Sequence, residues 1–185
     1  ELGLGTNNVN LTSNMGAHGK PGASLYAWRD FFKNGLIFGA DIDKDILFTD
    51  THIKTFYCDQ TSKESIEDLW KEEDLQENFD IIIEDGLHTF DAQCNFLKNS
   101  LHKLKKGGYY ITEDIMLNLK NKKKLIKFCQ NAFGDFEKEL PLLRDTFPGY
   151  TFELRKLPNP KNLNGNNEKY NKFNDNNILI VYRIN

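Results

Sequence analysis

The stretch Phe79-Asp-Ile-Ile-Ile-Glu-Asp-Gly-Leu-His88 decides the fold class of this chain. Its first five residues are mostly apolar and read as a strand covered on both faces, and acids, a glycine and a histidine follow directly. A helix-like segment at 89–104 comes next, and the pair Gly107-Gly108 separates it from an apolar segment at 109–112. Strand, helix and strand in this order are typical of a right-handed crossover in a parallel sheet.

The same alternation extends along the chain in both directions. Strands are predicted at 1–4, 36–42, 54–57, 79–83, 109–112, 150–154 and 178–184, and helices at 23–33, 62–75, 89–104 and 120–133. This order predicts an α/β fold, a doubly wound and mostly parallel Rossmann-like sheet with an antiparallel C-terminal strand. The Asn-, Lys- and Gly-rich stretch 158–177 is too polar to bury, so we predict a loop there, with a functional lid as the alternative.

Composition narrows the classes of partner. The chain has 185 residues and a net charge of −3, which suits one domain and gives no basic field for nucleic acid. No apolar run approaches the ~20 residues that a membrane span needs. The cysteines Cys58, Cys94 and Cys129 lie far apart without a CxxC pair, so we predict reduced core thiols in a cytoplasmic protein. Residue 1 already lies near the end of a predicted strand, and we therefore expect a further N-terminal part in the native chain.

Ligands of open parallel sheets bind beyond the carboxyl ends of the strands. The first predicted strand runs into Glu1-Leu-Gly-Leu-Gly5, whose glycines permit a tight turn and close approach to a ligand. A dinucleotide fingerprint would have a third glycine at position 8, where this chain has Asn8. A long segment at 6–21 then delays the next helix, so pyrophosphate binding is disfavoured.

Polar side chains also end the second and third predicted strands. Asp41 is placed to accept both hydroxyls of a ribose, and Asp59 with Gln60 is placed to contact an adenine edge. A solvated acidic turn at Asp41 and Asp43 is the alternative, and a helix N-cap region is the alternative at Asp59 and Gln60. The residues alone leave these alternatives open.

Several of the acidic candidate residues follow the fourth and fifth predicted strands. Asp85 and His88 follow the fourth strand, and Glu113 and Asp114 follow the fifth. Neighbouring strands lie about 4.8 Å apart, so the carboxylates of Asp85 and the 113–114 pair can reach one ion. Carboxylates so close together need a counter-charge, and oxygen ligands suit Mg²⁺, Mn²⁺ or Ca²⁺. His88 would stand beside that ion without having to bind it.

These segments together resemble a known family. Residues 1–6, 22–32, 38–43, 59–61, 79–88 and 107–114 are similar to class I S-adenosylmethionine-dependent methyltransferases. The closer resemblance is to the metal-dependent O-methyltransferase branch that acts on sugars of macrolide antibiotics and bacterial glycans, related to the proteins labelled cephalosporin hydroxylases. Asp85-Gly-x-His88, followed by Gly107-Gly-Tyr and then Glu113-Asp114, is the most specific part of the pattern.

The resemblance implies a role for each candidate residue. The cofactor-binding residues would be Glu1, Gly3, Gly5, Asp41, Asp59, Gln60 and Asp85, with the glycines at the methionine part, Asp41 at the ribose, and Asp59 and Gln60 at the adenine. The ligands of Mg²⁺ or Mn²⁺ would be Asp85, Glu113 and Asp114. His88 would be the catalytic general base.

The implied reaction is methyl transfer from S-adenosylmethionine to a hydroxyl of a sugar or nucleotide-sugar, in bacterial glycan, capsule or natural-product biosynthesis. Residues 1–185 would form one catalytic domain acting on a small molecule, with neither nucleic acid nor membrane as a partner, and a homo-oligomer stays open. One alternative is a nicotinamide-dependent oxidoreductase or epimerase on a Rossmann fold. The other is a non-catalytic binding module, which the presence of all metal and base positions disfavours.

Overall fold

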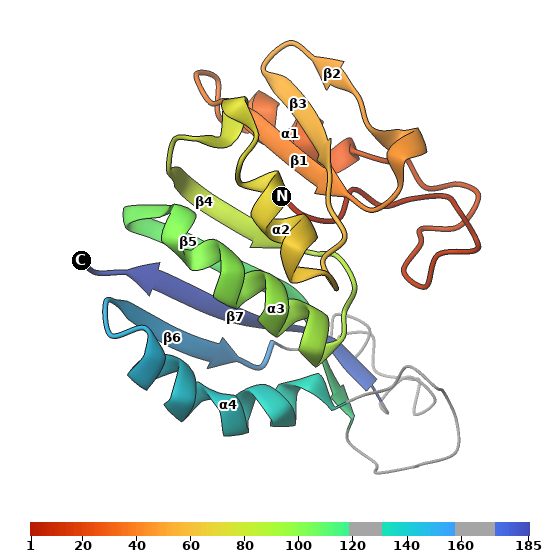
Figure 1. Ribbon diagram of the computed structural model, residues 1–185. Coiled ribbons are helices and arrows are strands. Elements are labelled where there is room, and N and C mark those ends of the chain that lie inside the picture. Colours follow the sequence, from red (N-terminus) through yellow and green to blue (C-terminus); the bar gives the residue numbers. More distant parts are fainter. Residues whose placement is uncertain (119–130, 158–172) are drawn as a thin grey trace. The chain divides into compact units, whose positions relative to one another are not determined.

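The computed structural model describes residues 1–118, 131–157 and 173–185 of the chain (Figure 1). The chain divides into two compact units, whose segments alternate along the sequence. The first unit consists of Glu1–Asn78, Ile83–Leu87 and Ala92–Lys103, and the second of Phe79–Ile82, His88–Asp91 and Leu104–Asn185. The single catalytic domain predicted for residues 1–185 stays a prediction.

The first unit is built on a three-stranded sheet. The strands β1 (Ile37–Asp41), β3 (Ile53–Tyr57) and β2 (Thr49–Asp50) lie in the order β1-β3-β2, with β1 and β3 parallel and β2 antiparallel to β3. Leu2 forms parallel bridges to Ala40 of β1 and to Glu84. The strand predicted at 1–4 is thus a bridge at Leu2, in the position expected of the first strand.

Helices and short 3₁₀ turns complete this unit. The helices are α1 (Ala23–Phe31), α2 (Lys63–Leu69) and α3 (Phe90–Ser100), and the 3₁₀ turns are Lys44–Ile46, Glu73–Leu75 and Leu101–Lys103. The side chain of Leu25 on α1 is fully buried and packs with Leu4 and Ile53. α2 begins at Ser62, whose hydroxyl accepts the Ser65 N–H in an N-cap.

The second unit contains a four-stranded sheet. The strands β4 (Phe79–Glu84), β5 (Leu104–Asn118), β7 (Phe173–Arg183) and β6 (Tyr150–Arg155) lie in the order β4-β5-β7-β6. β7 is antiparallel to both β5 and β6, which confirms the predicted antiparallel C-terminal strand. α4 (Ala132–Thr146) runs alongside β6 (Figure 1) and buries Phe133, Phe136 and Leu143.

Some element boundaries differ from those predicted. The helix expected to reach Leu104 ends at Ser100, and β5 begins at Leu104, because the fully buried Leu104 packs as a strand residue. The polar loop predicted at 158–177 is wrong for 173–177, which belong to β7; residues 158–172 lie outside the described part. Most of the helix predicted at 120–133 also lies outside it, and α4 was missed.

The face of β4 also corrects an expectation. The predicted cover on both faces holds for Ile82 and Ile83, which are buried, but Ile81 is 39% exposed.

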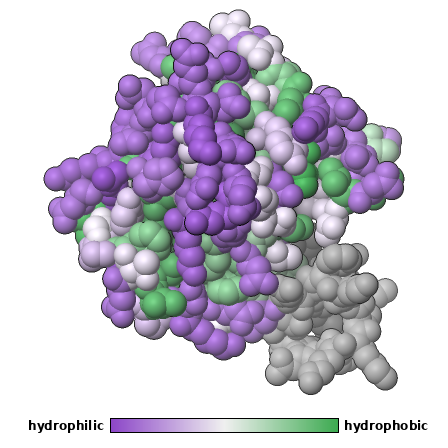
Figure 2. Space-filling model, in the orientation of Figure 1, coloured by the Kyte–Doolittle hydropathy of each residue, from purple (hydrophilic) through white to green (hydrophobic). Residues whose placement is uncertain are grey.

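None of the helices in the described residues is long and apolar enough to cross a membrane. Figure 2 shows hydrophilic residues over most of the visible face, with apolar residues in separate smaller areas.

The described cysteines are core residues, as predicted. Cys58 and Cys94 are both buried and form no disulfide, and Cys129 lies outside the described residues. Burial raises the pKa of the Cys58 thiol to about 12, because its thiolate would lose hydration.

We therefore expect Cys58 to resist alkylation in the folded protein. The rise of the pKa from 9.0 to about 12 lowers the thiolate fraction at mildly alkaline pH by about a thousandfold, and the thiolate is the reactive form. Since ionisation is favoured in the unfolded chain, this thiol also lowers the free energy of unfolding as the pH rises above 9.0 toward 12. Mass spectrometry of the Cys58 peptide after iodoacetamide treatment, with and without urea, measures the protection; equal labelling would contradict it.

Candidate functional site

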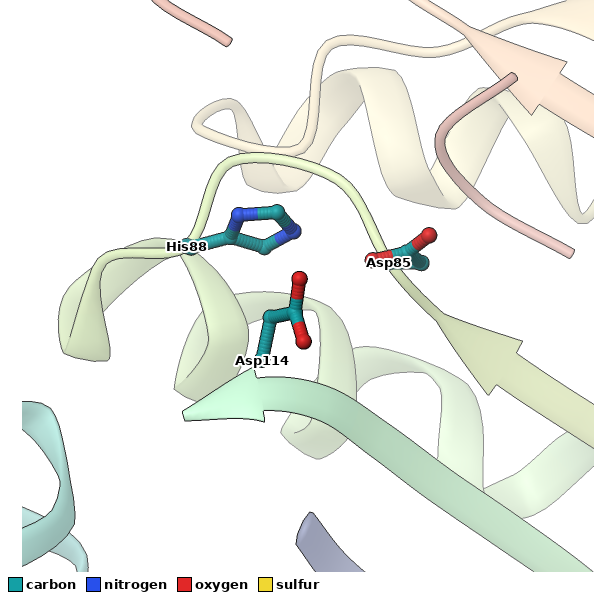
Figure 3. A group of neighbouring side chains, drawn as sticks. All are labelled: Asp85, His88 and Asp114. Atoms are coloured by element: carbon teal, nitrogen blue, oxygen red, sulfur yellow. The ribbon is translucent and has the colours of Figure 1, made fainter. Parts of the chain in front are cut away.

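Two aspartates and a histidine form the candidate centre. Asp85, His88 and Asp114 each offer one ligand atom, and these atoms all lie within 4.8 Å of one another. Figure 3 shows the His88 ring next to the Asp114 carboxylate, with Asp85 at the start of the loop that carries His88. All three side chains are partly exposed. Within the described residues no second group of this kind occurs.

A β-bulge presents Asp114 to this group. Thr112 pairs with Leu179 and Ile115 with Asn177, so β5 has one residue more than β7 over this step. Asp114 has a φ of +49°, a left-handed conformation that is uncommon for residues other than glycine and that asparagine and aspartate tolerate best. Bulges of this kind redirect side chains next to functional sites.

The bulge is fixed from β7. The buried Asn177 amide donates a hydrogen bond of 2.8 Å to the main-chain carbonyl of Ile115. The sequence does not mark Asn177 as a functional residue, because it lies at the end of the polar stretch predicted as a loop. Glu113, the third predicted ligand, is not part of the three-residue group, although it precedes Asp114 directly. Its role as a ligand stays a prediction.

A buried amide holds the loop that carries Asp85 and His88. The side-chain Nε2 of Gln60 donates to Glu84 Oε1 at 2.7 Å, and its Oε1 accepts the Leu87 N–H at 2.7 Å. Gln60 is 6% exposed and Glu84 is fully buried. Both polar atoms of the Gln60 amide are therefore engaged with this loop, and its contact with adenine remains a prediction.

The glycine turn lies directly against the candidate centre. Gly3 has a φ of +94°, and a Cβ added to it would lie 2.1 Å from the main-chain oxygen of Asp85. Only glycine permits this approach of backbone to backbone. The predicted cofactor turn and the predicted metal ligand Asp85 are thus neighbours.

The long segment after the turn folds back onto it. The Met15 N–H donates to the Thr6 carbonyl at 2.8 Å, and the Asn7 side chain donates to the Gly19 carbonyl at 3.1 Å. A Cβ on Gly5 would lie 1.9 Å from the Met15 sulfur, so the Met15 side chain packs on this second glycine. No local pattern in the sequence indicates this contact, which joins two residues of an irregular segment.

Asp41 and Asp43 are not solvated, so the alternative of an exposed acidic turn is wrong. They are only 7% and 8% exposed. Asp41 accepts the Leu4 N–H at 2.7 Å and the Asp43 N–H at 2.9 Å, while Asp43 accepts the Thr6 hydroxyl and the Asp45 N–H. A carboxylate has about four acceptor positions, so Asp41 keeps capacity for a ribose hydroxyl.

The remaining predicted residues have local partners. Glu1 accepts the Trp28 Nε1–H at 2.6 Å and the Ser24 hydroxyl, which ties the glycine turn to α1. Asp59 accepts both the N–H and the hydroxyl of Thr61, at 2.9 and 2.7 Å, in a turn that leads to the Ser62 N-cap. These contacts favour the N-cap region as one role of Asp59, and cofactor binding by Glu1 and Asp59 stays a prediction.

Comparison with known proteins identifies relatives over about half of the chain. No protein-family model matches it. It is 31% identical over 94 residues to 8-demethyl-8-alpha-L-rhamnosyl tetracenomycin-C 2'-O-methyltransferase of Streptomyces olivaceus, covering 51% of this chain and 24% of the relative. It is 33% identical over 98 residues to demethylmacrocin O-methyltransferase of Streptomyces fradiae, covering 51% and 23%. The chain therefore spans about a quarter of the length of these relatives.

Solved structures extend the similarity of fold to almost the whole chain. The MycE methyltransferase from the mycinamycin biosynthetic pathway, in complex with Mg and SAH, superposes with a TM-score of 0.62 at 19% identity, covering 98% of this chain and 43% of that one. The plantazolicin methyltransferase BpumL, in complex with a triazolic desmethylPZN analog and SAH, has a TM-score of 0.56 at 10% identity, covering 88% of this chain and 73% of that one. The resemblance of this chain to class I S-adenosylmethionine-dependent methyltransferases, and to their sugar O-methyltransferase branch, is therefore confirmed.

Proposed function

We propose that this protein transfers a methyl group from S-adenosylmethionine to a hydroxyl of a sugar, with a divalent cation at the cluster of Asp85, His88 and Asp114. The observation that carries the proposal is the contact of the Gly3 turn with Asp85, which sets the predicted cofactor turn beside this cluster. The relatives named as methyltransferases of rhamnosyl tetracenomycin-C and demethylmacrocin support a sugar of a natural product as acceptor. Glycans, capsule sugars and nucleotide-sugars remain acceptors to be tested.

The side chains of the cluster fit a divalent cation. Two carboxylates and an imidazole have ligand atoms within 4.8 Å of one another, close enough for like charges to need a counter-charge. Asp85 and Asp114 would hold Mg²⁺ or Mn²⁺ through carboxylate oxygens. When bound, such an ion lowers the pKa of an acceptor hydroxyl that coordinates it.

The residues of the chain then perform positioning and proton transfer. An imidazole nitrogen of His88 accepts the proton of the sugar hydroxyl, a role that contributes about 10² to 10⁴ in rate. The hydroxyl oxygen forms a bond to the methyl carbon as the carbon–sulfur bond breaks, which yields a methyl ether and S-adenosylhomocysteine. The glycine turn and Asp41 orient the cofactor, because the reacting oxygen and carbon must lie about 3 to 3.5 Å apart.

Replacement of Asp114 tests the metal site. In Asp114→Asn the charge is lost, while asparagine tolerates the φ of +49° and keeps the bulge. We expect the affinity for Mn²⁺, measured by electron paramagnetic resonance, to fall by more than about 10-fold. Asp80→Asn is the matched control, because Asp80 is exposed and pairs with Lys105. Equal Mn²⁺ affinity in Asp114→Asn and the wild type would contradict the site, and Glu113→Gln tests the third predicted ligand in the same assay.

Replacement of His88 tests the base. His88→Gln should reduce release of S-adenosylhomocysteine, measured over a panel of rhamnosides, other glycosides and nucleotide-sugars, by about 10² to 10⁴. The affinity for S-adenosylhomocysteine should stay within about 2-fold of the wild type, because His88 acts on the acceptor. The control is His52→Asn, which removes an exposed imidazole at a φ of +60° in the turn between β2 and β3. Undiminished turnover in His88→Gln would rule out the base assignment.

A further inference from the structure

We propose that Gln60 and Glu84 form a buried clamp that sets the conformation of residues 85–88 and thereby the positions of Asp85 and His88. Both are positioning residues, and their importance for the reaction rests on the proposed function. The clamp is defined by the side chains of Gln60 and Glu84 and by the main-chain N–H groups of Gly86 and Leu87 that they bind.

One amide connects the two ends of the loop. Gln60 Nε2 donates to Glu84 Oε1 before Asp85, and Gln60 Oε1 accepts the Leu87 N–H just before His88, each at 2.7 Å. The orientation of this amide is unambiguous, because a flip would set its NH₂ against an N–H and its oxygen against a carboxylate. The loop is therefore held by a donor and an acceptor that cannot exchange.

The main chain at Gly86 lies in direct contact with the side chains of Gln60 and Glu84. Glu84 Oε1 also accepts the Gly86 N–H at 3.2 Å. A Cβ on Gly86 would lie 2.2 Å from Gln60 Oε1, so the main chain passes the amide where no side chain fits. The glycine of the Asp85-Gly-Leu-His88 sequence is thus explained by the clamp.

Gln60 is itself anchored from α3. Its main-chain carbonyl accepts the side-chain N–H of Asn95 at 2.8 Å, and the Asn99 side chain donates to Asn95 Oδ1 at 3.0 Å. Gln60 and Glu84 are both buried, so water does not compete for their hydrogen bonds. A buried carboxylate that loses its donor incurs a desolvation penalty, which makes the arrangement specific for an amide at position 60.

The clamp fixes the main chain between Asp85 and His88, and metal binding by the cluster depends on the positions of these two residues. A metal site requires its ligands within about 0.5 Å of the productive arrangement, and the clamped residues 86 and 87 lie between Asp85 and His88. Loss of the clamp should therefore weaken metal binding and release the loop, without removing any ligand. Residues that orient metal ligands typically contribute about 10- to 100-fold to metal affinity.

Exchange of the two side chains tests the clamp. Gln60→Glu replaces the donor to Glu84 with a second carboxylate, whereas the double variant Gln60→Glu/Glu84→Gln restores a carboxylate–amide pair with the roles reversed. We expect the amide hydrogens of residues 85–88 to exchange faster in Gln60→Glu. In the double variant the Leu87 N–H should regain protection, because position 60 still accepts it, whereas the Gly86 N–H should not, because its acceptor Oε1 at position 84 becomes an NH₂ donor. Mn²⁺ affinity should follow the same order, with a loss of about 10- to 100-fold in the single variant.

A control variant, Gln76→Glu, and a measurement of S-adenosylhomocysteine binding distinguish a role of Gln60 in the clamp from a role in adenine binding. Gln76→Glu makes the same change at an exposed amide that donates to the carbonyls of Trp70 and Glu72, and it should leave both readouts unchanged. If Gln60 served adenine binding instead, Gln60→Glu would weaken S-adenosylhomocysteine binding without affecting hydrogen exchange at 85–88, which would overturn the clamp. A wild-type protein that binds no Mn²⁺ would overturn the metal in the proposed function, while hydrogen exchange would still decide the clamp.

Discussion

Backbone hydrogen bonds on both sides of Leu2 are the constraint on which the candidate site depends. The Leu2 N–H donates to the Ile83 carbonyl at 2.9 Å and the Asp85 N–H donates to the Leu2 carbonyl at 2.8 Å, while Gly3 bonds to Ala40 on the other side. These bonds bring the ends of β1 and β4 to one edge, next to the glycine turn. Gly3 then meets Asp85 at a distance that no side chain would allow.

The acids at this edge divide into two kinds, and burial separates them. Asp41, Asp43 and Glu84 are buried, and their carboxylates accept hydrogen bonds from backbone N–H groups or from the Gln60 amide. Asp85 and Asp114 are partly exposed and contribute to the cluster. A buried carboxylate is stable only when donors surround it, so the first kind shapes the loops while the second kind remains accessible to a ligand.

Much of the fold was predictable because β1, β3 and β6 have the length of ordinary strands and contain the β-branched and aromatic residues that strands favour. The predictions failed where tertiary contacts outweighed local pattern. Leu104 joins β5 although it follows a helical stretch, and residues 173–177 join β7 although their composition is that of a loop. Asn177 illustrates the reason: it is buried, and its side-chain N–H donates to the Ile115 carbonyl, a partner that only the folded sheet supplies.

The sequence by itself determined most of the alternation of strands and helices, the glycine turn, and Asp85, His88 and Asp114 as candidate residues, because residue type and spacing carry this information. Only the tertiary structure decided which acids lie in the cluster and which are buried supports. Asp114 enters the cluster through a bulge with a φ of +49°, and Gln60 binds Glu84, 24 residues away in sequence. Such contacts depend on strand register and burial, which arise from the packing of the whole chain and leave no local pattern in the sequence.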